Sequence, residues 1–242
     1  LRLDQAMIIG LYLKDFSLLN KITSKIKSKE FILRHIKNIS KIDKDISVII
    51  SKDTIPECKI PQIQPKNLEI LKLRIRCEFY ESCNLIAGID PGGTTGLAII
   101  GGNRVLFLNV FDNIKHLIRI IDSIYKEIGL NAIKIGTGSP PERNQIIQSL
   151  EKYSAIVKLV NEKSSGSGSH TAAATRIAIR KETSETPQTY QPKDGEIAWI
   201  QHESRRLSNG LVTIDKQLAH QILVGKTSMK EAINTYTYKI KM

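Results

Sequence analysis

Short apolar runs recur in the first third of the chain and predict a small α/β arrangement. Residues 7–13 (MIIGLYL) and 46–50 (ISVII) are typical of buried strands, and residues 31–33 predict a shorter one. Residues 14–28 have the spacing of an amphipathic helix, whose apolar face would consist of Phe16, Leu19, Ile22 and Ile26. Three prolines within residues 55–65 then interrupt regular structure, so we expect a connector there.

A second and clearer series begins near residue 85. Three apolar runs with Gly-containing turns between them, at 85–90, 94–100 and 104–110, predict an antiparallel meander. Helical and strand patterns then alternate, with helices at 113–128, 141–153 and 169–181 and strands at 132–136 and 155–160. The expected order is β-β-β-α-β-α-β-α, which indicates one mixed sheet.

The remainder of the chain opens with a polar linker and becomes helical at 195–207, about 215–223 and 228–234. Ser228 and Glu231 stand in capping-box register. Trp199 is expected to be a packing anchor. The helices with Gly turns resemble a helix-turn-helix, but a tail that packs on the core or on a second subunit is preferred. The domains would be residues 1–83, 84–182 and 183–242.

The composition narrows the classes of partner and of cysteine chemistry, but it does not indicate one function. The 36 Lys and Arg residues against 24 acidic ones give a net charge of +12, which favours polyanionic partners such as nucleic acid. No apolar run reaches the ~18 residues of a membrane span. Cys58, Cys77 and Cys83 have no CxxC spacing, so we expect free thiols in a reducing cytoplasm.

The most informative segment is GIDPGGTTG, residues 88–96. Its acid, Asp90, ends a buried strand and is followed at once by small residues. Gly92, Gly93 and Thr94 would let a phosphate or a metal ion approach the backbone. The alternative is a plain hairpin turn in which Asp90 is a turn former.

This segment resembles the first strand of the RuvC and YqgF branch of ribonuclease H-like nucleases, which carries the same Gly-(Ile/Val)-Asp-Pro-Gly signature. The resemblance covers residues 85–181 by motif and element order. It implies a ribonuclease H-like mixed sheet, a three-strand meander followed by alternating helix and strand, with a small N-terminal α/β segment and a helical C-terminal tail. Archaeal proteins with such flanking segments are also similar.

The resemblance implies a site in which acids hold Mg²⁺ or Mn²⁺ for phosphodiester cleavage. Asp90 matches the first-strand acid, and Glu162 matches the acid after the fifth strand. His170 stands where the family has a third acid, and imidazole can bind a metal or act as a base. Asp90, Glu162 and His170 are therefore the expected catalytic and metal-binding residues, although Glu162 and His170 are equally consistent with solvent-facing side chains.

Two further segments are candidate contacts to nucleic acid. The turn and helix start in GTGSPPERN, residues 136–144, could bind an anion, with Arg143 on a phosphate. A routine strand-to-helix loop is the alternative. Arg205 and Arg206 are the expected contacts from the C-terminal helices. The loop SSGSGS, residues 164–169, is either a substrate loop or a flexible linker.

Three functions remain open at this point. The first is a metal-dependent, Holliday-junction-resolvase-like nuclease that acts on a DNA junction or on structured RNA/DNA, as a homodimer by resemblance. The second is a nucleic-acid-binding protein that has lost catalysis, which the missing third carboxylate favours. The third is an ATP-binding protein similar to sugar kinases and acetate kinase, because DPGGTTG also resembles their phosphate-binding turn.

Overall fold

The computed structural model describes residues 6–82, 84–162, 168–183 and 191–241. Cys83 and most of the expected Ser/Gly-rich loop lie outside these residues. The chain divides into two compact units. Unit 1 comprises Leu1–Leu85, Gly101–Phe107 and Ile120–Gly129, and unit 2 comprises Ile86–Ile100, Leu108–Arg119 and Leu130–Met242. The domain boundaries expected after residues 83 and 182 stay a prediction.

Unit 1 is built on a four-stranded parallel sheet with the order β2-β1-β3-β4. Its strands are β1 (Met7–Tyr12), β2 (Phe31–His35), β3 (Val48–Ser51) and β4 (Gln62–Ile63). Helix α1 (Phe16–Ile26) connects β1 to β2 and is capped by Asp15, whose carboxylate accepts hydrogen bonds from the amides of Ser17 and Leu18. Loops make the other two crossovers.

The core of unit 1 corrects one expectation and contains one helix that the sequence pattern did not predict. Ile22 and Ile26 of α1 are buried against the sheet, but Phe16 is 77% exposed because it is the first residue of the helix, beyond the part that packs. Helix α2 (Leu71–Phe79) has no counterpart in the sequence analysis. It buries alternate residues, Leu71, Leu73, Ile75 and Cys77, so it is covered on two sides and lacks an amphipathic period.

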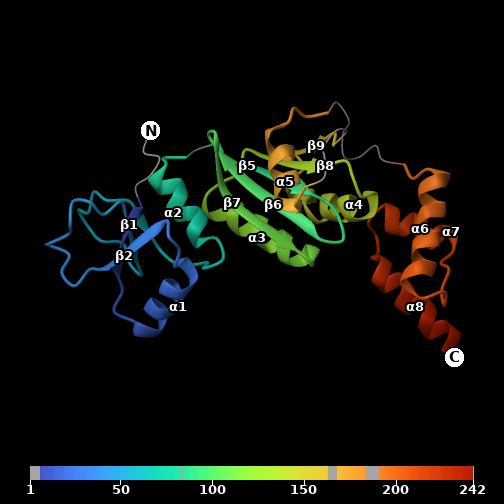
Figure 1. The fold of residues 1–242 in the computed structure, drawn as a ribbon, viewed down its shortest axis with the longest axis horizontal. Coiled ribbons are helices and arrows are strands. Elements are labelled where there is room, and N and C mark those ends of the chain that lie inside the picture. The colour runs from blue at the N-terminus through green and yellow to red at the C-terminus, as the bar shows by residue number, and fades with distance from the viewer. Residues whose placement is uncertain (1–5, 83, 163–167, 184–190, 242) are drawn as a thin grey trace. The chain divides into compact units, whose positions relative to one another are not determined.

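A mixed five-stranded sheet with the order β7-β6-β5-β8-β9 confirms the expected architecture (Figure 1). Strand β5 is central, pairs antiparallel with β6 and parallel with β8, and β8 pairs parallel with β9. The strands are β5 (Ile86–Asp90), β6 (Thr95–Gly101), β7 (Arg104–Phe111), β8 (Ala132–Gly136) and β9 (Val157–Val160).

Helices connect the later strands as the apolar spacing predicted. They are α3 (Ile114–Glu127), α4 (Pro140–Ser149), the 3-10 turn η1 (Glu151–Tyr153) and α5 (His170–Ile179). Strand β7 and helix α3 each pass from one unit to the other along the chain. Because the carboxyl ends of β5, β8 and β9 point the same way, residues that follow these strands meet at one end of the sheet.

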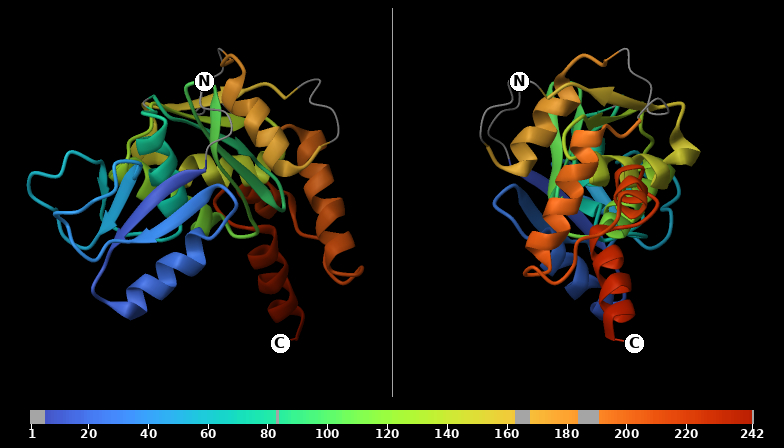
Figure 2. Two further views of the ribbon diagram at one scale, coloured as in Figure 1. Left: turned by 60° about the vertical axis from the view of Figure 1, so that its left-hand side comes forward. Right: turned by 90° about the vertical axis from the view of Figure 1, so that its right-hand side faces the viewer.

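The C-terminal helices are α6 (Asp194–Leu207), α7 (Lys216–Leu223) and α8 (Met229–Lys241), which pack around a small apolar core (Figure 2). The amide of Ser228 donates to Glu231 and the amide of Glu231 donates to Ser228, so the expected capping box is present. Trp199 is 56% exposed, so it is not the expected anchor, and its neighbour Ile200 is fully buried instead.

This helical segment packs on α4, as the preferred interpretation of the tail requires. The side-chain amide of Asn144 donates to the Leu223 carbonyl oxygen, and that of Gln145 donates to the Thr227 carbonyl oxygen at 2.9 Å. Asn144 is itself buried. Asn144 thus satisfies a carbonyl group at the end of α7 that otherwise lacks a partner inside the helix, and Gln145 satisfies one in the turn between α7 and α8.

Candidate functional site at the end of the central strand

Asp90 is the last residue of β5 and therefore lies at the carboxyl end of the central strand. Its side chain is 14% exposed. It stands opposite Gly96 of β6 in the ladder. The position is fixed on both sides, because β5 pairs with β6 and with β8. A carboxylate here is held rigidly and still reaches the surface.

Two glycines of the GIDPGGTTG segment let α5 lie directly on the sheet. A Cβ atom at Gly88 would stand 2.2 Å from the backbone oxygen of Ala174 and 2.7 Å from the Cβ of Ala178. A Cβ at Gly96 would stand 2.2 Å from the backbone oxygen of His170. Figure 1 shows α5 lying across β5 and β6. These two glycines therefore serve helix packing, a purpose that the sequence analysis did not assign.

This close packing brings His170 to Asp90 from eighty positions away in the chain. His170 is the first residue of α5, after the N-cap Ser169, whose hydroxyl accepts from the amide of Ala172. Its Nδ1 lies 3.1 Å from Oδ2 of Asp90, and its side chain is 51% exposed. A neutral imidazole that donates from Nδ1 to the carboxylate presents Nε2 to solvent as a proton acceptor.

Glu162 follows β9 and turns its carboxylate toward the end of β8. Gly138 donates its backbone N–H to Oε1 of Glu162 at 3.1 Å. A Cβ at Gly136 would stand 1.7 Å from Oε1, and a Cβ at Gly138 would stand 2.7 Å from Oε2. The turn that the sequence predicted as an anion site thus binds a carboxyl group of the same chain through Gly138, and phosphate binding there stays a prediction.

The charges at this end of the sheet influence one another. Burial raises the pKa of the Glu162 carboxyl above its ordinary value, while the hydrogen bond from Gly138 lowers it. The carboxylate of Asp90 raises that pKa further, and the guanidinium groups of Arg180 and Arg143 lower it. Asp90 thus interacts electrostatically with Glu162 and contacts His170 directly.

Two threonine side chains form hydrogen bonds that hold the loop after Asp90 in place. Thr94 donates its hydroxyl to Asp112 at 2.9 Å, and Thr95 donates to the Gly92 carbonyl oxygen at 3.2 Å. A Cβ at Gly93 would meet nothing within 4 Å, so this residue borders open space. Gly92, Gly93 and Thr94 as ligand-binding residues stay a prediction.

The arginines that the sequence selected lie in different surroundings. Arg143 is buried at 7% exposure, where it donates to the Thr137 carbonyl oxygen at 2.8 Å. Arg205 and Arg206 lie on the exposed side of α6, and Arg206 forms an ion pair with Glu203. The structure does not bring them to Asp90 through any interaction that it describes, and their contact with nucleic acid stays a prediction.

The structure describes no three-donor metal cage at this site. Among the described residues, no group of three His, Cys, Asp or Glu side chains is close enough together to hold a metal ion. Asp90 and His170 are in direct contact, whereas Glu162 is turned to Gly138. What remains compatible with a divalent cation is the pair of carboxylates, because Mg²⁺ is commonly held by one or two carboxylates with water and phosphate oxygens completing its shell.

Other properties of the chain add little to this site. Cys58 and Cys77 are free thiols, and burial raises the pKa of Cys77 to about 11. In the described part of the chain, no helix combines the length and apolarity that crossing a bilayer requires.

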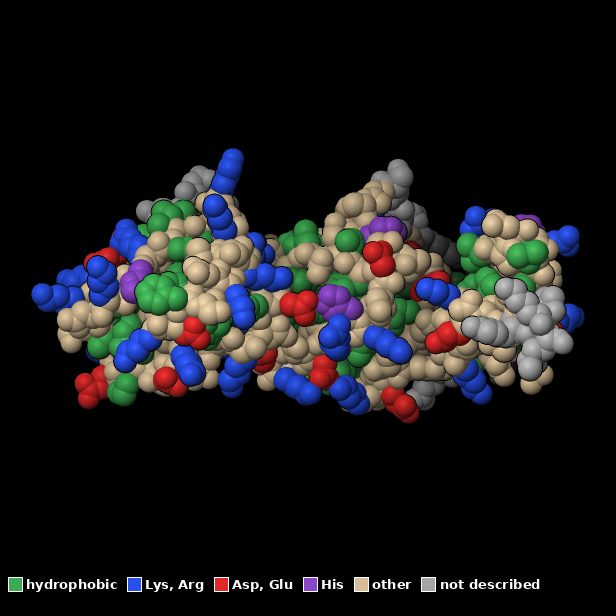
Figure 3. Space-filling view, turned by 90° about the horizontal axis from the view of Figure 1, so that it is seen from below, with side chains coloured by type: hydrophobic (Ala, Val, Ile, Leu, Met, Phe, Trp, Pro, Cys, Tyr) green, Lys and Arg blue, Asp and Glu red, His purple; other side chains and the backbone are tan. Residues whose placement is uncertain are grey.

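Lys and Arg side chains are numerous on the face shown in Figure 3, where Asp and Glu side chains stand among them.

Comparison with known proteins gives a family model and similar solved structures. Residues 193–237 match a family described as a three helical bundle domain. Two structures of RuvC from Thermus thermophilus are similar in fold, each at 14% identity. One of them is in complex with a Holliday junction substrate, and its similarity covers 40% of this chain and 90% of the RuvC chain at a TM-score of 0.33. The similarity to the other covers 39% of this chain and 90% of the RuvC chain at a TM-score of 0.31. No curated protein matches the sequence.

Proposed function

We propose that this chain is a nuclease-like protein that binds structured nucleic acid at the end of the five-stranded sheet, with Asp90 and Glu162 facing the phosphate backbone through a divalent cation. The observation that carries the proposal is the contact between His170 and Asp90 at the carboxyl end of β5, beside which Glu162 is turned to the end of β8 and interacts electrostatically with Asp90. The effect of Asp90 on the pKa of Glu162 supports it, because two carboxylates that disfavour each other's charge are stabilised by a cation between them.

The residues have distinct tasks in this proposal. Asp90 and Glu162 would hold Mg²⁺ or Mn²⁺, which, when bound, would polarise the phosphodiester and activate a water molecule. Asp90 also orients His170 through its Nδ1. His170 then presents Nε2 at the surface, where it can take a proton from a nucleophile or give one to a leaving oxygen. The net charge of +12 makes the approach of a polyanion favourable and predicts that affinity falls as salt rises.

A second function has one specific observation in its favour. His170 stands where a third carboxylate would complete a cation site, and it is in contact with Asp90. A protein with this arrangement could bind a junction or a structured RNA/DNA without cutting it. The two functions share the binding surface and differ in turnover.

The test is a cleavage and binding assay on labelled four-way junctions, single strands and RNA–DNA hybrids with Mn²⁺ or Mg²⁺. Asp90→Asn removes the central carboxylate charge at nearly constant shape. Asp194→Asn is the matched control, because Asp194 is an exposed acid at the start of α6. Cleavage that disappears only with Asp90→Asn supports the nuclease. Binding without cleavage supports the second function, and the absence of both would refute the proposal.

A further inference from the structure

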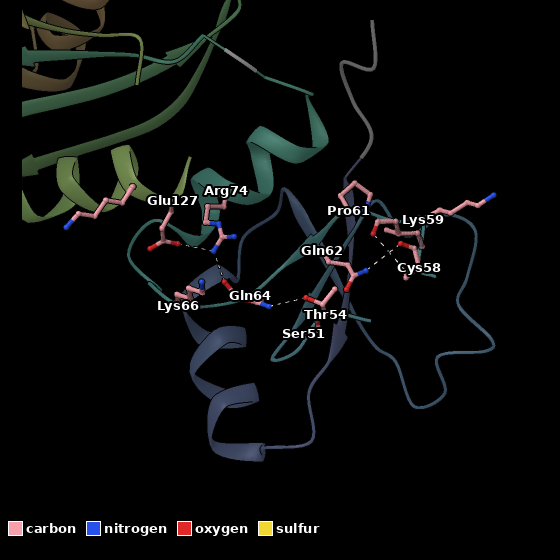
Figure 4. Close-up of a pocket in the computed structure, with 12 residues that line it drawn as sticks. Ser51, Thr54, Cys58, Lys59, Pro61, Gln62, Gln64, Lys66, Arg74 and Glu127 are labelled. Carbon is pink, nitrogen blue, oxygen red and sulfur yellow. Dashed lines mark hydrogen bonds and ion pairs between the residues drawn. The ribbon is translucent and has the colours of Figure 1, made fainter. Parts of the chain in front are cut away.

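Unit 1 contains a pocket that the proposed function does not use. Its volume is about 580 Å³, within the range of about 300–1,000 Å³ that small-molecule sites occupy. The pocket lies where β3 and β4 end, and residues of the two following loops, of α2 and of the end of α3 line it (Figure 4). All of these residues belong to unit 1.

The topology of the sheet places this pocket at a position suited to ligand binding. The chain runs from β1 to β2 on one side and returns to β3 on the other side of β1, so the strand order reverses between β1 and β3. Ser51, the last residue of β3, stands opposite Tyr12, the last residue of β1. In open parallel sheets, ligands bind outside the carboxyl ends of the strands near such a reversal, and this pocket lies at the carboxyl ends of β3 and β4, next to it.

Ser51 supplies the most specific sign that a ligand belongs here. Its side chain is 1% exposed, it lines the pocket, and its hydroxyl has no hydrogen-bond partner. A buried hydroxyl without a partner costs free energy, so native proteins rarely retain one without a reason. A ligand atom that exchanges a hydrogen bond with Ser51 would remove this cost.

Nearby polar groups are already used to shape the pocket. The side-chain amide of Gln62 accepts from the Ile55 amide at 2.7 Å and donates to the Ile55 carbonyl oxygen at 3.0 Å, which fastens the loop after β3. Arg74 donates through Nη1 to the Gln64 carbonyl oxygen at 2.6 Å and to Glu127 at 3.0 Å. Ser51 differs from these groups because its hydroxyl has no hydrogen-bond partner.

The charged side chains that line the pocket favour an anionic ligand. The lining carries four cationic side chains and one acidic one, Glu127. Arg74 pairs with Glu127, and Lys126 pairs with Asp122. Lys59 and Lys66 form no ion pair within the described part of the chain. In Figure 4, Lys66 lies near Arg74 and Gln64, whereas the Lys59 side chain extends outward. The charge of Lys66 is therefore the one placed to meet a ligand.

We propose that this pocket binds a small ligand through a phosphate group, which accepts hydrogen bonds from Ser51 and from those N–H groups of Arg74 that have no acceptor among the described residues, and is neutralised by Lys66. A donor-rich lining with an arginine, a lysine and a hydroxyl matches a phosphate, whose oxygens only accept. The volume leaves room for a nucleoside beside the phosphate. The site is independent of Asp90 and of the proposed function.

The test is calorimetric titration of the full chain with inorganic phosphate, AMP and adenosine. We expect phosphate and AMP to bind and adenosine to bind at least about ten-fold more weakly, because a charged hydrogen-bonding partner is lost. Binding by phosphate and AMP alike would assign the site to the phosphate alone, and tighter binding of AMP would add the nucleoside. Adenosine that binds as tightly as AMP, or no binding up to about 10 mM, would overturn the proposal.

Variants locate the binding in this pocket. Ser51→Ala should weaken AMP binding about ten-fold or more, yet it should melt at the same temperature as wild type or higher, since it removes a hydroxyl that has no partner. Lys66→Gln should also weaken binding and reduce its dependence on salt. Lys41→Gln, an exposed lysine outside the lining, is the control. Unchanged affinity in Ser51→Ala, or binding of oligonucleotides but not of AMP, would contradict the assignment.

Discussion

The close approach of α5 to the central strand leads to the sharpest prediction, which concerns Gly88→Ala. The added Cβ would stand 2.2 Å from a backbone oxygen of α5, and backbone cannot turn away as a side-chain end can. The helix must therefore move by about 1 Å, and overpacking of this kind typically costs about 1–3 kcal/mol. We expect the upper end of that range, a free energy of unfolding lower by about 3 kcal/mol.

Gly93→Ala is the matched control for this change. It introduces the same methyl group five residues away, where nothing lies within 4 Å and the backbone φ is not positive. It should be neutral or should stabilise the protein by about 0.4–1 kcal/mol, because alanine restricts the unfolded chain. Urea denaturation followed by circular dichroism gives both values. Equal stability of the two variants would refute the direct packing of α5 on β5, and with it the cause assigned to the contact between Asp90 and His170.

Two further predictions concern single polar side chains. Glu162→Gln removes a carboxyl whose pKa is raised in the folded state, so its charged form opposes folding. The stability of wild type relative to this variant should be greatest below the ordinary pKa of 4.5 and should fall as pH rises through the folded-state pKa. Denaturation at a series of pH values measures this difference, and a difference that stays constant with pH would contradict the prediction. Ser204→Ala removes a buried hydroxyl that donates to the Gln201 carbonyl oxygen at 2.7 Å and accepts from the Ile214 amide at 3.2 Å. We expect urea denaturation to show a free energy of unfolding lower by about 1–3 kcal/mol. A variant as stable as wild type would contradict this role of the hydroxyl.

The order of strands and helices after residue 85 could be predicted because short apolar runs separated by turns alternate with longer helical segments. The apolar face of α3 and the alternation after it are visible in the sequence, whereas the order of the strands within the sheet comes from the structure. Helix α2 could not be predicted, because burial on two sides removes the amphipathic signal. Phe16 and Trp199 show the same limit, since apolarity does not say which residues of a helix face outward.

The candidate site residues were selected by residue type, and their arrangement could not be predicted. Asp90, Glu162 and His170 were selected through the motif, and the structure places His170 on Asp90. The interpretation of the glycines was incomplete. Gly88, Gly96 and Gly136 leave space for parts of the same chain, a backbone carbonyl or a carboxylate, and such space cannot be told from ligand space without the fold.

Unit 1 is discontinuous in the sequence, and this has a consequence for synthesis on the ribosome. Three of its internal hydrogen bonds join the first 85 residues to later segments: Asn67 to Ser123, Arg74 to Glu127 and Arg76 to the Leu106 carbonyl oxygen. A nascent chain that has emerged only to residue 85 lacks every one of these partners. Since chains emerge N-terminus first, unit 1 cannot reach its complete structure until residue 129 is free, by which time the first three strands of the five-stranded sheet have also emerged.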